Sequence, residues 1–273
     1  MKRSGLQDLM EVTPQPDGSF EAHCLNGARD RIFGGQVAAQ ALRAAALVAP
    51  KDRDPHSLHC SFLRPGDPSI PVTYVVTVLK NGRSFTTFRV DAHQRERLIF
   101  TALASFHLDE PSPQYHSLAP DAPDHLLFPV NDFIPPGSNP KVRQPIEFRY
   151  LDPATTGDLA AEPKQLIWLR ARDRLSDDFV MHACALTYAS DLTLTRTAHL
   201  PLRGPGISKM GASLDHSLWF HRRFRADDWL LFSQETTSYA GARALSQGQL
   251  FTTDGLLVAS VSQEALIRVQ PAR

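Results

Sequence analysis

The sequence contains no apolar run that approaches the roughly 18 residues needed by a membrane-spanning helix. Its start, MKRSGLQDLMEV, has a basic pair but lacks the apolar stretch of a signal peptide. Neither charge dominates, because Lys plus Arg and Asp plus Glu number 29 each. No bulk field therefore favours nucleic acid or an anionic membrane, and we expect neither as a partner.

Cysteine is also scarce. Cys24, Cys60 and Cys184 are scattered and odd in number, and no two of them form a CxxC pair. They suit small buried residues in a reducing cytoplasm better than disulfides or zinc ligands. The 273 residues, 42% of them apolar and 21% charged, describe a soluble globular protein with one large domain or two of ordinary size.

Proline is unevenly distributed. Of the 21 prolines, 11 lie between Pro111 and Pro163, in text such as DEPSPQYHSLAPDAP. This density predicts an irregular connection with short extended pieces and no long helix. The connection divides the chain into two parts.

The two parts resemble each other. In the first, HSLHCSFL is followed by PVTYVVTVLKNGRSFTTFRVDAH and LIFTALASFHL; in the second, DHSLWFHRRF is followed by WLLFSQETTSYAGARALSQGQLF and LLVASVSQEAL. The offsets are nearly constant: Ser57 to Ser213 is 156, Arg83 to Arg243 is 160, and Leu98 to Leu256 is 158. Such a weak internal repeat indicates one structural unit present twice.

Strand-like alternation dominates each copy, and each copy has one helix candidate. The alternating positions expected on single faces are Val72, Tyr74, Val76 and Val78, and then Phe100, Ala102, Ala104 and Phe106. Residues 33–48 have apolar residues at helical spacing and are rich in alanine, and SDDFVMHACALTYASDL begins with Ser176 as a plausible N-cap. The pattern predicts an α+β fold with one helix packed on each antiparallel sheet.

The run VASVSQEALI, residues 258–267, places a glutamine in a predicted strand. With a period of two, Leu257, Ala259, Val261, Gln263 and Ala265 share an apolar face, and Val258, Ser260, Ser262 and Glu264 share a solvated one. Gln263 should point inward, where its amide needs hydrogen-bond partners. Those partners are either backbone groups, as for an ordinary core glutamine, or functional side chains.

Several long motifs resemble acyl-CoA thioesterase II: RIFGGQVAAQAL, HSLHCSFLRPGDPSIPV, GRSFTTFRV, ALTYASDLTL, SLDHSLWFHRRFRADDWLLF and GLLVASVSQEALIR. The resemblance extends from about Arg31 to Arg268. It implies a double hotdog, with an N-terminal hotdog at 1–110, a proline-rich linker at 111–140 and a C-terminal hotdog at 141–273. It also implies hydrolysis of fatty acyl-CoA without a cofactor or metal, in a homodimer or larger assembly.

The same resemblance implies three site residues. The Asp of YASD is Asp191, the Gln of SVSQE is Gln263, and the hydroxyl two residues before the Asp-His of LDH is Ser213, where many relatives carry Thr. In the family, a carboxylate, a hydroxyl and an amide hold and activate the attacking water. Asp191 would be the base or water anchor, Ser213 would hold the water, and Gln263 would orient the water and the thioester carbonyl.

The local sequence is compatible with these roles without requiring them. Asp191 follows an apolar stretch and has no Lys or Arg three or four residues away. A helix ending at about Leu192 would place the carboxylate at the negative end of the helix dipole, and this position and burial would both raise its pKa. The alternative is a cap or turn residue. Ser213, taken alone, is equally compatible with turn chemistry.

Competing sites are less well supported. No GxSxG nucleophile elbow is present, and SNPK lacks the acid and the histidine of the hotdog hydratase signature DxNPxH. Equivalent packing positions in the two copies explain the histidines near the two SL motifs more simply than a metal does; they are His56, His59, His216 and His221. The glycines of FGGQ could face an oxygen or serve close packing, and RRFRADD could meet phosphates or be a solvated cluster.

Two other functions remain open on this scaffold. A non-catalytic acyl-CoA-binding protein would bind the thioester without turnover. A dehydratase or hydratase would act on a double bond and leave the thioester intact.

Overall fold

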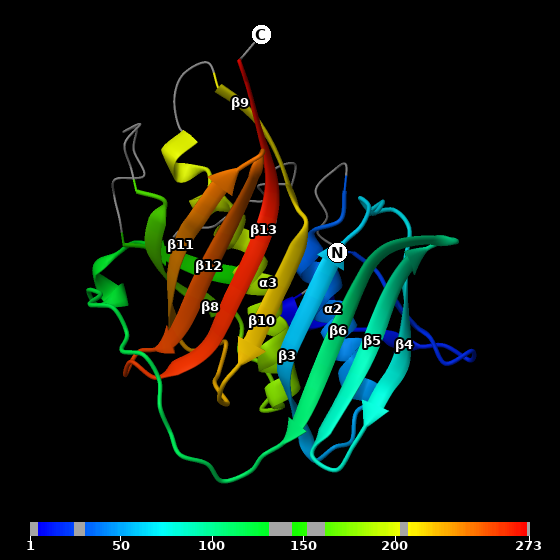
Figure 1. Cartoon of the computed structure of the whole chain (residues 1–273). Coiled ribbons are helices and arrows are strands. Elements are labelled where there is room, and N and C mark those ends of the chain that lie inside the picture. Colours follow the sequence, from blue (N-terminus) through cyan, green and yellow to red (C-terminus); the bar gives the residue numbers. More distant parts are fainter. Residues whose placement is uncertain (1–4, 25–30, 131–143, 152–161, 203–206, 272–273) are drawn as a thin grey trace.

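The computed structural model describes residues 5–24, 31–130, 144–151, 162–202 and 207–271. Within these residues, 13 strands form one antiparallel sheet (Figure 1). The first half contains α1 (Leu6–Leu9), β1 (Thr13–Pro14), β2 (Phe20–Ala22), α2 (Gly34–Val48), β3 (Arg53–Phe62), β4 (Val72–Asn81), β5 (Phe85–Gln94) and β6 (Arg97–Leu108). The second contains η1 (His125–Leu127), β7 (Ile146–Tyr150), β8 (Lys164–Ala171), α3 (Phe179–Thr197), η3 (Leu200–Leu202), β9 (Ile207–Ser213), β10 (Asp215–Phe220), β11 (Leu230–Ala240), β12 (Arg243–Thr252) and β13 (Leu257–Pro271).

The internal repeat is visible in the strand order. The neighbours β4-β5-β6-β3 of the first half match β11-β12-β13-β10 of the second, and β3 pairs with β10 to join the halves. Leu58 lies opposite Leu218, with Ser57 opposite Trp219 and Ser217 opposite His59. Adding 160 to a residue number in β3 gives the equivalent residue in β10, and the same pairs result from both strands. Ser217 is therefore the structural equivalent of Ser57. The offset of 156, which matched Ser57 to Ser213, is therefore wrong at this strand.

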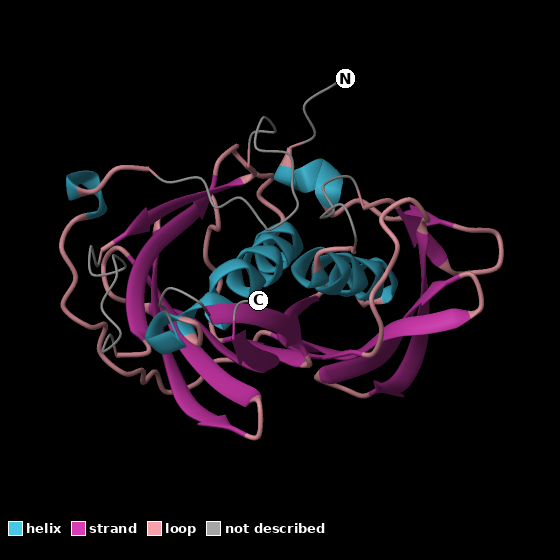
Figure 2. Ribbon diagram, turned by 90° about the horizontal axis from the view of Figure 1, so that it is seen from above, coloured by secondary structure: helices cyan, strands magenta, loops and turns pink. Residues whose placement is uncertain are grey.

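The two long helices lie side by side, with the sheet curving around them (Figure 2). Helix α2 begins one residue later than predicted, and its alanines pack closely, with Ala38, Ala41 and Ala45 fully buried. None of the described helices is long and apolar enough to cross a membrane.

Helix α3 differs from the prediction at both ends. Its N-cap is Asp178, not Ser176, because the Asp178 carboxylate accepts a hydrogen bond from the Val180 N–H (3.1 Å). The helix continues past Leu192 to Thr197. Asp191 thus lies inside the helix and not at its C-terminal end.

The predicted strand faces are mostly confirmed. The residues Phe100, Ala102, Ala104 and Phe106 are all buried, and Val72 and Tyr74 are fully buried. Val76 is partly buried against the core, whereas Val78 is exposed, as are the residues of β4 that follow it.

Strand β13 contains an irregularity at Val258. Leu250 pairs with Ala259 whereas Phe251 pairs with Leu257, so Val258 is the extra residue of a β-bulge. The bulge moves Leu257 to the outer face, where it packs with Trp168, and buries Val258 in the main core. The predicted faces are therefore wrong at these two positions and correct at Gln263, which is 1% exposed.

The described part of the proline-rich segment, residues 109–130, forms an extended strap with one short 3-10 turn. It crosses the face of the C-terminal sheet that lies away from α3. Anchoring bonds come from Trp168 to Pro123 O, from Arg149 to His125 O, from Gln249 to Ser117 and from Arg222 to Tyr115 O. The irregular connection is confirmed for these residues, and 131–143 lie outside the described residues.

Candidate active site

Three elements of the C-terminal half bring the predicted site residues together. Asp191 comes from α3, Ser213 ends β9, and Gln263 lies on β13. Gln263 Nε2 donates to Asp191 Oδ1 (2.5 Å) and to Ser213 Oγ (2.9 Å). Ser213 Oγ lies 3.5 Å from Asp191 Oδ1 as a longer donor contact. The side chains thus form a closed hydrogen-bonded triangle.

The Asp191 carboxylate also contacts the first half of the chain. Its Oδ2 atom accepts a hydrogen bond from the Gly35 N–H at 2.7 Å, in the first turn of α2. The N-terminal end of a helix carries partial positive charge and stabilises an anion. The expectation that the carboxylate lies at the negative end of its own helix is wrong, because α3 continues to Thr197 and the nearby helix end belongs to α2.

The two glycines of FGGQ allow this approach. A Cβ atom on Gly35 would lie 2.7 Å from the Phe33 ring and 2.9 Å from the Tyr188 carbonyl oxygen of α3. A Cβ atom on Gly34 would lie 2.8 Å from the Phe62 ring and 3.1 Å from Asp191 Oδ2. The two alternatives expected for these glycines therefore occur together. Gly35 packs closely against α3, and its N–H donates to an oxygen, which in this structure is Oδ2 of Asp191.

Gln263 is satisfied by side chains and not by the backbone. Besides the two donor contacts, its Oε1 atom accepts a hydrogen bond from Thr195 Oγ1 at 3.1 Å. Thr195 was not among the predicted site residues. The signal for it was present, because Thr195 follows Asp191 by four residues and lies on the same side of α3.

A buried histidine lies behind the site. His216 is fully buried, and its Nε2 atom lies 2.9 Å from Ser190 Oγ. Burial lowers the pKa of His216, while the charges of Asp191 and Asp215 partly oppose this shift. The ring is therefore neutral at pH 7 and packs as a core group.

The other histidines near the SL motifs lie apart from His216 and have separate partners. His56 Nε2 lies 2.8 Å from Ser105 Oγ, and His59 contacts the Trp219 ring edge-on. His221 Nε2 lies 2.9 Å from Ser260 Oγ. In the described parts of the chain, no group of three metal-ligating side chains occurs.

The arginines of RRFRADD are engaged within the chain. Arg222 donates to Leu257 O, Arg223 forms an ion pair with Asp54 of the other half, and Arg225 binds Asp227 through two nitrogens. Asp227 in turn accepts the Leu175 N–H just before α3. This motif therefore holds the strap and the start of α3 in place.

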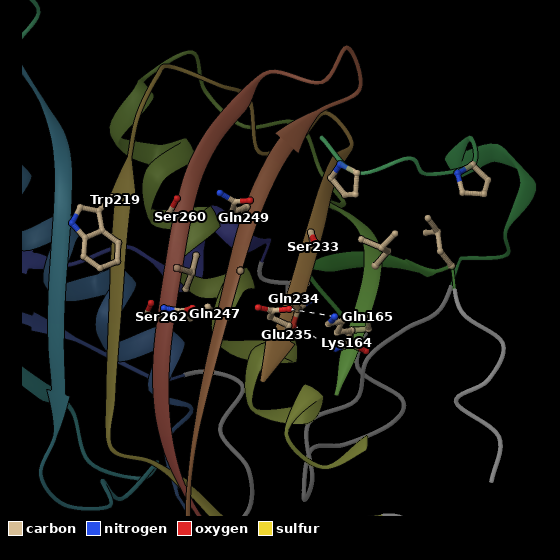
Figure 3. Close-up of a pocket in the computed structure, with 16 residues that line it drawn as sticks. Lys164, Gln165, Trp219, Ser233, Gln234, Glu235, Gln247, Gln249, Ser260 and Ser262 are labelled. Atoms are coloured by element: carbon tan, nitrogen blue, oxygen red, sulfur yellow. Dashed lines mark hydrogen bonds and ion pairs between the residues drawn. The ribbon is translucent and has the colours of Figure 1, made fainter. Parts of the chain in front are cut away.

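A groove of about 930 Å³ opens on the outer face of the C-terminal sheet (Figure 3). Pro120 and Pro123 of the strap form part of its wall, and Trp219 lies at one edge. Its polar lining residues include Ser233, Gln247, Gln249, Ser260 and Ser262. Asp191, Ser213 and Gln263 do not line it, so this groove is separate from the predicted site residues.

Comparison with known proteins finds relatives of this chain both by sequence and by fold. The model of the family described as acyl-CoA thioesterase matches residues 141–266, and that of the acyl-CoA thioesterase N-terminal domain matches residues 25–107. An acyl-CoA thioesterase II, TesB2, from Mycobacterium marinum has a TM-score of 0.83 and 35% identity, covering 97% of this chain and 99% of that one.

Two curated relatives are similar over most of their length. Acyl-CoA thioesterase 2 of Haemophilus influenzae is 38% identical over 281 residues, covering 97% of each chain. Acyl-coenzyme A thioesterase 8 of Mus musculus is 40% identical over 260 residues, covering 88% of this chain and 81% of the relative.

Two halves of one continuous sheet, each with a long helix packed on its concave side, define the double hotdog, so the predicted fold class is confirmed. The chain belongs to the acyl-CoA thioesterase family, a family of thioester hydrolases.

Proposed function

We propose that this protein hydrolyses acyl-CoA thioesters to a free fatty acid and CoA at the Asp191–Ser213–Gln263 triangle. The observation that carries the proposal is the pair of Gln263 Nε2 hydrogen bonds, which tie a buried carboxylate to a half-buried hydroxyl. The similarity to acyl-CoA thioesterases supports the substrate class.

The chemistry needs a base, a positioned water and a polarised carbonyl. Asp191 accepts a proton from water as the water oxygen forms a bond to the thioester carbonyl carbon. The tetrahedral intermediate then collapses, the carbon–sulfur bond breaks, and the CoA thiolate leaves and takes the proton that Asp191 had accepted. Ser213 holds the water beside Asp191, and Gln263 orients the water and the thioester carbonyl. The Gly35 N–H keeps the carboxylate in place. The reaction uses no cofactor.

The first experiment follows CoA thiol release with a thiol dye across acyl-CoAs from short to very long chains. Asp191→Ala should lower the rate roughly 10²–10⁴-fold, the range expected when a general base is removed. Asp178→Asn is the matched control, because asparagine also serves as an N-cap of α3. An unchanged rate in folded Asp191→Ala would remove this residue from the mechanism.

A non-catalytic acyl-CoA-binding protein is the alternative that the same assay separates. Saturable binding of acyl-CoA without thiol release would establish it. The complete Asp, Ser and Gln set favours the hydrolase, because a pure binder does not need these three groups hydrogen-bonded together.

We also propose that the protein is located in the cytoplasm. We further propose that it associates with itself as a homodimer or larger assembly. Large apolar side chains that the chain itself leaves uncovered support it: Tyr115 is 90% exposed, Leu118 is 89% and Leu127 is 73%. Light scattering after size exclusion measures the mass directly, and a mass of 30.3 kDa would contradict the proposal.

A further inference from the structure

We propose that Thr195 is a positioning residue that fixes the amide of Gln263 in its working orientation. This inference rests on the proposed function, because it concerns the same site. Thr195 contacts Gln263 and neither Asp191 nor Ser213 through its hydroxyl, so it acts through the amide.

The Asp191 carboxylate dictates which end of the amide faces it. An ionised carboxylate only accepts hydrogen bonds, and Gln263 can offer it either two N–H donors or a carbonyl oxygen. The amide end of Gln263 that lies 2.5 Å from Asp191 Oδ1 must be Nε2, because two oxygens at that distance would repel each other. The Oε1 end must therefore point the other way, towards α3.

Thr195 supplies the donor that this orientation requires. Thr187, on the same helix, donates instead to the carbonyl four residues earlier, Ala183 O, at 2.8 Å. The single hydroxyl proton of Thr195 is directed to Gln263 Oε1 at 3.1 Å. Because Gln263 is 1% exposed, bulk water does not reach Oε1, so the Thr195 hydroxyl supplies the hydrogen bond that this oxygen needs.

Loss of that donor affects the triangle in a specific way. Oε1 would be left buried without this hydrogen bond, which favours amide rotations that recover a partner. Each such rotation turns Nε2 away from Asp191 and Ser213, which are the groups proposed to hold the water. Substrate binding elsewhere in the site is unaffected, so the effect falls on kcat more than on KM.

The experiment compares Thr195→Val, which removes the hydroxyl at nearly constant volume, with Thr195→Ser, which keeps it. We expect Thr195→Val to lower kcat about ten-fold, as for a lost buried hydrogen bond, with little change in KM. Thr195→Ser should recover most of the rate. Thr187→Val is the matched control, because it removes a back-bonded hydroxyl from the same helix, and its kcat should match the wild type.

A double-mutant cycle with Gln263→Ala then tests whether Thr195 acts through the amide. Thr195→Val should have no further effect once Gln263 is alanine. If Gln263→Ala is impaired but Thr195→Val equals the wild type, or if the two losses multiply, the positioning role is wrong. If Gln263→Ala itself has full activity, the proposed function of the triangle fails first.

Discussion

The Gly35 N–H donates to Asp191 Oδ2 across 2.7 Å, although 156 residues separate the two in sequence. Gly35 lies in the first turn of the helix of the first repeat, and Asp191 lies within the helix of the second. The proposed base is therefore held by both halves of the chain. A single hotdog repeat of this chain would contain either Gly35 or Asp191, but not both.

Adding one methyl group at Gly35 should break this arrangement. The Cβ atom of Gly35→Ala would lie 2.9 Å from Tyr188 O, a backbone atom that cannot give way without moving α3. We expect the stability to fall by about 1–3 kcal/mol, as for other overpacked sites, together with loss of turnover. Urea unfolding and thiol release measure both effects. Gly5→Ala is the control, since its Cβ atom would lie 3.6 Å from Asp173 in ordinary contact, and equal losses in the two variants would contradict the prediction.

The hydroxyl at position 213 should matter more than the exact residue. Ser213→Ala removes the acceptor of one Gln263 N–H, and we expect turnover to fall about ten-fold. Ser213→Thr keeps the hydroxyl and restricts its rotation at χ1, so its turnover should equal or exceed that of the wild type. Steady-state kinetics of the three proteins decides this. An active Ser213→Ala would show that the hydroxyl is dispensable.

Stability should decrease below about pH 6.5 because of buried neutral histidines. Burial lowers the pKa of His216 and of His182 below the ordinary value of 6.5. In this range the unfolded chain binds more protons than the folded chain, so their contribution is present above pH 6.5 and is lost as the pH falls.

Urea unfolding at pH 7.5 and pH 5 tests the sign of this effect. His216→Gln should show a shallower loss between the two pH values than the wild type, because one titrating group is gone. Gln7→Ala, at an exposed position, should keep the wild-type pH dependence. Identical pH dependence in His216→Gln and the wild type would contradict the assignment.

The proline-rich strap should loosen without loss of catalysis when Arg222 is removed. Its guanidinium donates to Gln114 Oε1 and Tyr115 O of the strap and to Leu257 O of the sheet. Arg222→Ala should be cut faster by chymotrypsin after the exposed Tyr115. Turnover should be unchanged, since these contacts lie on the sheet face opposite Gln263. Arg223→Ala, which loses an ion pair with Asp54 and a cation–π contact with Phe179 but no printed bond to the strap, should resist the protease as the wild type does. Equal cutting of both variants would refute the anchor.

Much of the fold was predictable because local periodicity and tertiary burial agree. The inward direction of Gln263 follows from a period of two, and the alanine-rich helix follows from helical spacing. The face of Leu257 was not predictable, because the bulge at Val258 depends on pairing with β12 and has no glycine or proline to mark it. The end of α3 was also missed, because the threonines beyond Leu192 have weak helix propensity and are stabilised by packing against the sheet.

The duplicated α+β unit follows from periodicity, and the family and the candidates Asp191, Ser213 and Gln263 follow from motifs that resemble that family; both are local properties of the chain. That these residues meet, that Gly35 of the other repeat holds the carboxylate and that Thr195 satisfies Gln263 are features of the tertiary structure alone. Such contacts join positions 22 to 156 residues apart. They depend on how α2, α3 and β13 pack, and no local pattern encodes that packing.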